Sequence, residues 1–379
     1  MNLLILFENS IDPLRGGVER VYSNLVPFFL ENGIYTYAYY FDECKYEKPH
    51  CYSGVFKGEN NMNLSNVKKE LLFLLDKWEI KVVICAYPSS VLMNAVESMQ
   101  GVMVFHHVHN DPCQLFDSSQ LHFFKNHHIN NKLSAILSHI YMHYKYAKHF
   151  RKADKNGHKV VLLSENFRPK FKKLFPMKDE NIVSVPNPVV IDKLQDAKLL
   201  HKENILLYVG RLSEYQKNVS SLLRIWGNLY RRLPDYKLII VGDGVDKAVY
   251  EKMSDEMKLE NIEFKGYQTP SQYYIQSRSL LMVSRFEGFG MVLVEAMQYG
   301  CIPFAYNSYE SLSDIIDDGV NGFMISPFDE KEYAEKLFAF LKLPDTEKFK
   351  YSNAAMKKAK SFDVSVVGCQ WLNLFNVIK

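Results

Sequence analysis

The sequence lacks the features of an exported or membrane-spanning protein. Its six cysteines include no Cys-x-x-Cys pair and no metal-ligand spacing, which favours reduced thiols in a cytoplasmic protein. No apolar run approaches the roughly 18 residues that a membrane-spanning helix needs. The apolar start, residues 1–7, is short and has no basic region, so it predicts a buried strand rather than a signal peptide. We therefore expect a cytoplasmic protein, and any membrane contact to be peripheral.

The chain also lacks internal repeats, low-complexity segments and a strong net charge. Its formal charge is only +3, so the total charge does not indicate a partner. The hydrophobic fraction of 47% and the aromatic fraction of 14% exclude a disordered chain and suffice for large cores. A length of 379 residues exceeds one typical domain and predicts two or three.

Short apolar runs alternate with longer helical patterns, which predicts a parallel α/β architecture. In the first half the expected strands are 3–7, 36–41, 82–85, 102–105 and 160–163. In the second half they are 205–209, 237–241, 262–264, 280–283 and 302–305. Two sets of about five buried strands indicate two doubly wound domains rather than one barrel.

The break between the domains is expected at residues 185–189. Pro186 and Pro188 restrict themselves and the residues before them, so this stretch predicts an extended link. The domains are then residues 1–185 and 186–360. The chain from residue 345 onward has helical patterns.

The most informative stretch is residues 284–297. A predicted strand runs into a glycine-broken loop that carries Glu287, and a helix is expected to open at about Gly290. Glu295 follows Glu287 by eight positions, inside this helix. The first N–H groups of a helix have no intrahelical partner and attract phosphate, while flanking carboxylates suit sugar hydroxyls. The stretch therefore predicts a site for a nucleotide-sugar diphosphate.

This spacing resembles the Glu-x7-Glu motif of the family 4 retaining glycosyltransferases, which have the GT-B fold. The resemblance covers nearly the whole chain and is densest over residues 205–324. It implies two Rossmann-like domains that face each other across a cleft, the first binding the acceptor and the second the nucleotide-sugar. It also implies that a C-terminal helix, within residues 361–379, packs back on the N-terminal domain.

The same resemblance assigns roles around the motif. Glu287 would hold the hydroxyls of the donor sugar, and Glu295 those of the ribose. The loop and helix start between them would bind the donor through Gly288, Phe289, Gly290, Met291 and Val292.

Two cations follow the first strand of the second domain. Arg211 lies in the loop and Lys217 lies near the expected helix start. Surface cations on a loop are the ordinary interpretation of such a pair. The family, however, uses the same spacing to bind the donor pyrophosphate, where two cations would neutralise the charge that develops on the leaving group.

Gly16 and Gly17 follow the first strand and precede a helix expected over residues 18–29. Glycines there let the backbone approach a ligand, although an ordinary strand-to-helix turn has the same composition. The stretch is similar to the Gly-Gly-x-Glu loop of the family, which implies that both glycines close over the donor phosphates.

Three histidines follow another strand of the first domain. His106, His107 and His109 lack the carboxylates and the spacing of a metal site, so we expect no metal here. The resemblance places His109 opposite the donor sugar, where it would position the donor rather than act as a general base. His106 and His107 are nearer the strand and are expected to be structural.

Two further loops belong to the predicted donor site. Gly242 and Gly244 resemble half of a dinucleotide fingerprint, but the third glycine is missing, so a tight turn near the nucleotide is the better interpretation. Gly266 and Tyr267 follow the next strand, where relatives bracket the nucleobase with backbone groups.

Residues 120–173 are strongly basic, with a local balance of +10. Only Asp154 and Glu165 oppose twelve cations: Lys125, Lys132, Lys145, Lys148, Arg151, Lys152, Lys155, Lys159, Arg168, Lys170, Lys172 and Lys173. Aromatic residues are interleaved with them. Such a helix either lies on an anionic membrane surface or is a solvated helix with its aromatics in the core. No nucleic-acid-binding motif accompanies the charge, so nucleic acid is not expected as a partner.

The resemblance implies transfer of a sugar from a nucleoside-diphosphate donor, for which a UDP-sugar is expected, with retention at the anomeric carbon. The acceptor would be a saccharide or a polyprenyl-diphosphate-linked oligosaccharide of a bacterial surface polysaccharide. No Asp-x-Asp lies at a strand end, so no metal and no other cofactor is expected. The alternatives are a GT-B sugar-nucleotide epimerase, a phosphorylase or a non-catalytic sugar-nucleotide-binding subunit; a nucleic-acid-binding module would leave the two glutamates unexplained.

Overall fold

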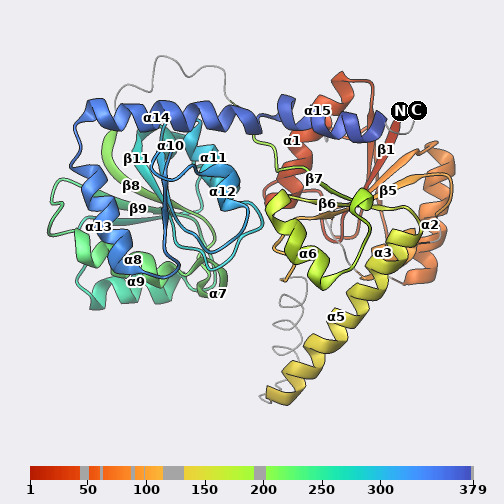
Figure 1. Cartoon of the computed structure of the whole chain (residues 1–379), viewed down its shortest axis with the longest axis horizontal. Coiled ribbons are helices and arrows are strands. Elements are labelled where there is room, and N and C mark those ends of the chain that lie inside the picture. Colours follow the sequence, from red (N-terminus) through yellow and green to blue (C-terminus); the bar gives the residue numbers. More distant parts are fainter. Residues whose placement is uncertain are drawn as a thin grey trace. The chain divides into compact units, whose positions relative to one another are not determined.

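The computed structural model describes residues 1–42, 51–59, 63–86, 90–97, 99–113, 132–191 and 202–376. The chain folds into two compact units (Figure 1). Unit 1 contains Met1–Pro188 together with Val364–Lys379, and unit 2 contains Val189–Asp363. The chain thus enters unit 2 at Val189 and leaves it after Asp363. The boundaries predicted from the sequence were residues 186 and 361.

Unit 1 has a parallel seven-stranded sheet with the order β3-β2-β1-β4-β5-β6-β7. Its central strands are almost wholly apolar and buried, as expected for parallel strands covered on both faces. The strands are β1 (Asn2–Leu6), β2 (Tyr35–Tyr40), β3 (Gly54–Lys57), β4 (Val82–Cys85), β5 (Met103–Val108), β6 (Lys159–Leu162) and β7 (Ile182–Ser184).

Helices cover this sheet, and the last helix of the chain is one of them (Figure 1). They are α1 (Gly17–Glu31), α2 (Leu64–Lys77), α3 (Ser90–Val96), α5 (Lys132–Lys155), α6 (Arg168–Leu174) and α15 (Val364–Asn376). Helix α15 packs on α1, where the rings of Phe375 and Phe29 lie 5.6 Å apart. Gly368 allows this approach, because a Cβ atom there would lie 2.3 Å from the Phe28 ring. The first and the last helix of the chain thus share one core.

Unit 2 has a parallel six-stranded sheet with the order β10-β9-β8-β11-β12-β13. The strands are β8 (Glu203–Val209), β9 (Lys237–Val241), β10 (Ile262–Gly266), β11 (Ser277–Met282), β12 (Ile302–Tyr306) and β13 (Phe323–Ile325). In this order β8 and β11 are neighbours at the centre, so the loops that follow them are adjacent at the carboxyl edge of the sheet.

The helices of unit 2 form two groups, which Figure 1 shows on both sides of the sheet. Helices α8 (Val219–Leu229), α9 (Lys247–Glu256) and α13 (Glu330–Leu341) pack together. Helices α10 (Ser271–Gln276), α11 (Met291–Met297) and α14 (Asp345–Ala359) form the second group. Two short helices, α7 (Glu214–Lys217) and α12 (Leu312–Ile315), complete the unit.

The predicted α/β class is confirmed, and each of the ten predicted strands overlaps an observed strand. Three observed strands were not predicted: β3, β7 and β13. Each is only three or four residues long and lies at an edge of its sheet. An edge strand has less surface to bury, so its sequence need not form the apolar run that marks a central parallel strand.

Candidate active site

The carboxyl edge of the unit 2 sheet brings together four loops that carry the predicted donor-binding residues. These loops follow β8, β9, β10 and β11. Because all four strands are parallel, their carboxyl ends meet at one edge, where α/β proteins bind their ligands.

Lys217 and Glu287 form a buried ion pair at this edge. The Nζ atom of Lys217 lies 2.5 Å from Oε1 of Glu287, and the side chains are only 18% and 9% exposed. Gln216 donates from Nε2 to the other carboxylate oxygen of Glu287, at 3.4 Å. Two residues predicted to belong to the same donor site are therefore in direct contact, although one ends α7 and the other lies in the loop after β11.

A second pair, Arg285 and Glu214, joins the same two loops. Arg285 donates through Nη2 to Oε1 of Glu214 at 2.9 Å and through Nη1 to the Glu214 carbonyl. Its backbone N–H donates to the Gln216 carbonyl at 2.8 Å. The loop of Lys217 is thereby fastened to the loop of Glu287 beside their ion pair.

Glu214 is held in its ionised form by its neighbours. Burial alone would raise the pKa of Glu214, but hydrogen bonds from Arg285, Ser220 and Tyr250 outweigh it and hold the pKa below its usual value. No role was predicted for Glu214 or Arg285 from the sequence. Their position directly beside the two recognised motifs was the available signal.

The glycines after β8 and β9 let two loops interlock. Gly242 has a φ of +148°, and a Cβ atom there would lie 1.9 Å from the Gly210 carbonyl oxygen. A Cβ atom on Gly244 would lie 2.2 Å from the Leu212 carbonyl oxygen. The two loops are joined by a hydrogen bond from Leu212 N to the Asp243 carbonyl, 2.9 Å long. A turn starts at Gly244, where Lys247 N donates to the Gly244 carbonyl at 3.2 Å, and close backbone packing explains Gly242 and Gly244.

Helix α11 starts directly after Gly290, close to the predicted position. Gly290 is left-handed, with φ +87°, and a Cβ atom there would lie 2.8 Å from the Tyr309 hydroxyl oxygen. Ser311 donates from Oγ to the Gly288 carbonyl at 2.8 Å, which holds the preceding loop. With seven residues, α11 is short, so its free N–H groups rather than a large macrodipole would attract an anion.

The other predicted donor residues differ in their exposure. Phe289 and Met291 are buried, and the Phe289 ring packs on Phe362 at 5.4 Å, so only their backbone can meet a ligand. Glu295 is partly buried and accepts a hydrogen bond from the Tyr274 hydroxyl at 3.0 Å. Tyr267 is 65% exposed.

Arg211 is the exposed cation of the site. Its carbonyl accepts a hydrogen bond from Tyr208 at 3.1 Å, and its guanidinium forms no ion pair within the described parts of the chain. Burial, together with the nearby charge of Glu287, raises the pKa of Tyr208, which therefore remains a hydrogen-bond donor. Arg211 is positioned through its backbone carbonyl, so its guanidinium can bind a ligand.

Gly16, Gly17 and His109 lie in unit 1. Gly16 is the N-cap of α1 and Gly17 is its first residue. His109 follows β5 and is buried, with its ring centroid 3.8 Å from that of His107. Burial lowers the pKa of His109 to about 3, and Asn187 offsets only part of this shift. His109 is therefore neutral at physiological pH.

His106 and His107 are buried and hydrogen-bonded, in agreement with a structural role. Nδ1 of His107 lies 2.8 Å from the Tyr22 hydroxyl, and Nε2 of His106 lies 3.2 Å from Nδ1 of His158. Among the residues that the structure describes, no cluster of three or more His, Cys, Asp or Glu side chains could hold a metal ion.

The basic segment divides between two environments, as far as it lies within the described residues; residues 120–131 lie outside them. On α5, Tyr146 and Phe150 are buried in the core beneath α5 and α6, whereas Tyr141 and Tyr144 are 62% and 66% exposed. Helix α5 therefore has one face with aromatic residues in the core and one exposed face, and contact with a membrane stays a prediction. No helix in the described part of the chain is long and apolar enough to cross a membrane.

Solved structures with the same architecture cover the whole chain. S. aureus TarM, in a complex with UDP, aligns with a TM-score of 0.77 and 15% identity over 99% of both chains. The galactosyltransferase WaaB aligns with a TM-score of 0.73 and 20% identity, also over 99% of both. Anabaena HepE, in a complex with UDP-glucose, aligns with a TM-score of 0.75 and 17% identity over 100% of both chains. The fold is GT-B.

Sequence comparisons match the chain to glycosyltransferases, and the matched family model lies within unit 2. Residues 190–361 match the family described as "Glycosyl transferases group 1". The amylovoran biosynthesis glycosyltransferase AmsD of Erwinia amylovora is 29% identical over 58% of this chain and 62% of its own length. The lipopolysaccharide 1,6-galactosyltransferase of Salmonella typhimurium is 33% identical over 39% of this chain and 41% of its own. The chain thus spans about half the length of these curated relatives.

Proposed function

We propose that this protein is a retaining glycosyltransferase of the family 4 type. It transfers a sugar from a UDP-sugar to a saccharide or polyprenyl-diphosphate-linked acceptor in the synthesis of a bacterial surface polysaccharide. The observation that carries the proposal is the Lys217–Glu287 pair at the carboxyl edge of the unit 2 sheet. The matched family and the printed activities of the relatives support the same reaction class.

The donor diphosphate would take the place of Glu287 as the main partner of Lys217. In the structure the two charges neutralise each other inside a partly buried site. A diphosphate carries more negative charge than one carboxylate and would attract Arg211 as well, because that guanidinium is exposed and unpaired within the described residues. The released Glu287 then accepts hydrogen bonds from the donor sugar, and Glu295 accepts them from the ribose. Gly266 and Tyr267 flank the base.

In the transfer step the bond from the anomeric carbon to the diphosphate oxygen breaks. The acceptor oxygen forms its new bond on the same face of the sugar, and the acceptor proton passes to the leaving phosphate oxygen. Arg211, Lys217 and the first N–H groups of α11 stabilise the charge on the departing diphosphate. The resemblance to the family gives Gly16 and Gly17 a part in binding the phosphates. His109, which is neutral, positions the donor.

No metal or other cofactor is required in this proposal, and nucleotide binding tests it. In a thermal-shift panel of UDP, GDP, ADP and their sugar conjugates, we expect UDP-sugars to raise the unfolding midpoint equally with and without EDTA. A ligand at 100 times its Kd stabilises the folded state by about 2.7 kcal/mol. If no nucleotide shifted the unfolding midpoint, the proposed function would be contradicted. If EDTA abolished the shift, donor binding would require a metal ion.

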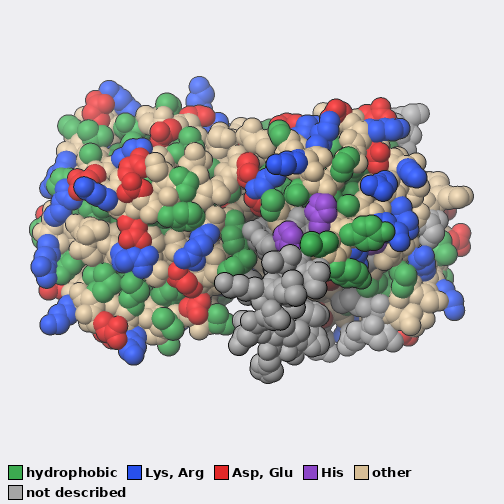
Figure 2. All heavy atoms as spheres, turned by 60° about the horizontal axis from the view of Figure 1, so that its bottom comes forward, with side chains coloured by type: hydrophobic (Ala, Val, Ile, Leu, Met, Phe, Trp, Pro, Cys, Tyr) green, Lys and Arg blue, Asp and Glu red, His purple; other side chains and the backbone are tan. Residues whose placement is uncertain are grey.

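The acceptor proposal includes peripheral contact with the anionic inner face of the cytoplasmic membrane, through residues 120–173. The exposed side of α5 carries Tyr141 and Tyr144 followed by Lys148, Arg151 and Lys155 at helical spacing. Figure 2 shows a face of unit 1, on the right, where hydrophobic, histidine and basic side chains lie close together. Aromatic groups suit the headgroup boundary, and cations suit anionic lipids.

Replacing Lys148, Arg151 and Lys155 with glutamine should weaken binding to phosphatidylglycerol-rich vesicles. At about 1 kcal/mol for each cation, the loss is roughly 100-fold in a vesicle co-sedimentation assay. Lys152 is left unchanged because it pairs with Glu97 at 2.8 Å. The matched control replaces three exposed lysines of unit 2: Lys331, Lys357 and Lys360. Equal losses in both variants would contradict a docking role for α5.

A further inference from the structure

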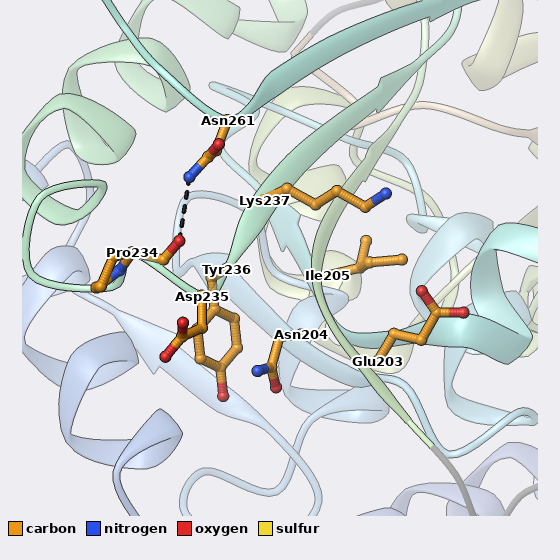
Figure 3. Close-up of a pocket in the computed structure, with 8 residues that line it drawn as sticks. All are labelled: Glu203, Asn204, Ile205, Pro234, Asp235, Tyr236, Lys237 and Asn261. Atoms are coloured by element: carbon orange, nitrogen blue, oxygen red, sulfur yellow. Dashed lines mark hydrogen bonds between the residues drawn. The ribbon is translucent and has the colours of Figure 1, made fainter.

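The amino edge of the unit 2 sheet has a second cluster of charged side chains, at the opposite end of the strands from Lys217 and Glu287. Two pockets open there, of about 250 and 510 Å³, and they share Glu203, Asn204 and Asp235. Figure 3 shows the smaller pocket, with Asn204 between Asp235 and Glu203. The larger pocket is lined by three cations: Lys202, Arg278 and Lys348.

These cations are partly or largely buried, and they outnumber the carboxylates that pair with them. The side chains of Arg278 and Lys348 are only 12% and 10% exposed. Lys202 donates from Nζ to the carbonyls of Tyr274 and Ile275, both at 2.9 Å, and no described carboxylate forms an ion pair with it. Burial lowers the pKa of Lys202 to about 8, and burial also lowers the pKa of Lys348. A buried charge is costly unless an opposite charge meets it.

A single carboxylate oxygen currently serves two of the three cations. Oδ1 of Asp345 lies 3.1 Å from Nη1 of Arg278 and 3.4 Å from Nζ of Lys348. The Asp345 side chain is 79% exposed, so it reaches this position from the rim and is free to turn back into solvent. Glu203 and Asp235 are also exposed, where water screens their charges. The pocket therefore has a cationic floor and an acidic rim.

We propose that the larger pocket binds a small phosphorylated metabolite, whose phosphate group replaces Asp345 between Arg278 and Lys348. A phosphate has several strong acceptor oxygens, whereas Asp345 uses only one oxygen here. The phosphate can therefore also neutralise the charge of Lys202. Helix α14 has fifteen residues and begins at Asp345, so the positive end of its dipole adds to the attraction.

The remaining lining suits an organic group attached to the phosphate. A volume of about 510 Å³ exceeds the need of an inorganic ion and lies in the range of small-molecule sites. Ile302, Phe340 and Phe349 provide apolar surface, and Asn204 and Ser352 provide polar groups for hydroxyls. The site is separate from the proposed sugar transfer, because its residues lie at the amino ends of the strands. Either proposal can fail without the other.

Titration calorimetry at constant ionic strength, with the intact chain, tests the site. We use inorganic phosphate, glucose 1-phosphate and glucose as probes. Glucose 1-phosphate is expected to bind saturably, phosphate more weakly, and glucose not at all. Binding of glucose as strong as that of glucose 1-phosphate would overturn the proposal, as would the absence of saturable binding by both phosphorylated probes.

Three variants assign the binding to this pocket rather than to the donor site. Asp345→Asn removes the competing carboxylate and should tighten glucose 1-phosphate binding roughly fivefold, a gain that misfolding cannot produce. Lys348→Gln should weaken the binding of glucose 1-phosphate by at least about tenfold. The control Lys350→Gln, on the same helix but 71% exposed and paired with Glu347, should leave it unchanged. Weaker binding by Asp345→Asn, or equal losses from Lys348→Gln and Lys350→Gln, would contradict the proposal.

Discussion

Replacing Glu287 with glutamine is expected to lower kcat for sugar transfer roughly 100- to 1,000-fold without weakening the binding of UDP. The carboxylate is proposed to hold the donor sugar, whereas UDP lacks that sugar and is bound through Arg211 and Lys217. Glutamine keeps the size of the side chain and removes only its charge. Radiolabelled transfer from a UDP-sugar would measure kcat, and calorimetry with UDP would measure binding.

Glu263→Gln is the matched control for this variant. Glu263 is also a carboxylate of unit 2 that pairs with lysines, Lys237 and Lys265, but it lies within β10 and is 36% exposed. We expect transfer by Glu263→Gln to remain within about twofold of the unaltered chain. Transfer that survives in Glu287→Gln, or that falls equally in both variants, would contradict the role given to Glu287.

Replacing Gly242 with alanine should lower the free energy of unfolding by about 3 kcal/mol. The φ of +148° at Gly242 is open to glycine only, and the new Cβ atom would meet the Gly210 carbonyl oxygen at 1.9 Å. The loops after β8 and β9 must then separate. Since Arg211 follows Gly210 directly, UDP binding should weaken in the same variant. Urea unfolding followed by circular dichroism would measure the stability.

The matched control is Gly319→Ala, also in unit 2. Gly319 has a φ of +71°, but a Cβ atom there would meet nothing within 4 Å. We expect Gly319→Ala to lower the free energy of unfolding by about 1 kcal/mol, through backbone strain alone, and to leave UDP binding unchanged. If the two alanine variants lost the same stability, steric contact between the two loops would not be the reason for Gly242.

Central strands and their order of appearance were predictable from the sequence because parallel strands covered on both faces are almost wholly apolar. The segments at Val82–Cys85 and Lys237–Val241 are examples, and both were found in place. The edge strands Gly54–Lys57 and Phe323–Ile325 were not predicted, because a short strand with a single neighbouring strand has little hydrophobic pattern in its sequence.

The candidate site was predictable only in part. Glu287, Lys217 and Arg211 were selected as candidates from the spacing of their motifs, but no local pattern pairs Lys217 with Glu287, which lie 70 residues apart in the chain. Arg285 and Glu214 were missed as a pair for the same reason, since each alone is an ordinary charged residue near a turn. The split of α5 into a buried face with Phe150 and an exposed face with Tyr144 likewise required the packing.

The sequence by itself determined the α/β class, ten of the strands and the residues that resemble a donor site, because hydrophobic patterning and motif spacing are local properties. The tertiary structure alone decided which charges meet. The order β10-β9-β8-β11-β12-β13 makes the loops after β8 and β11 neighbours, and so joins Lys217 to Glu287. The same fold gathers Lys202, Arg278 and Lys348 at the other edge. Such contacts depend on strand order, which short-range sequence patterns do not encode.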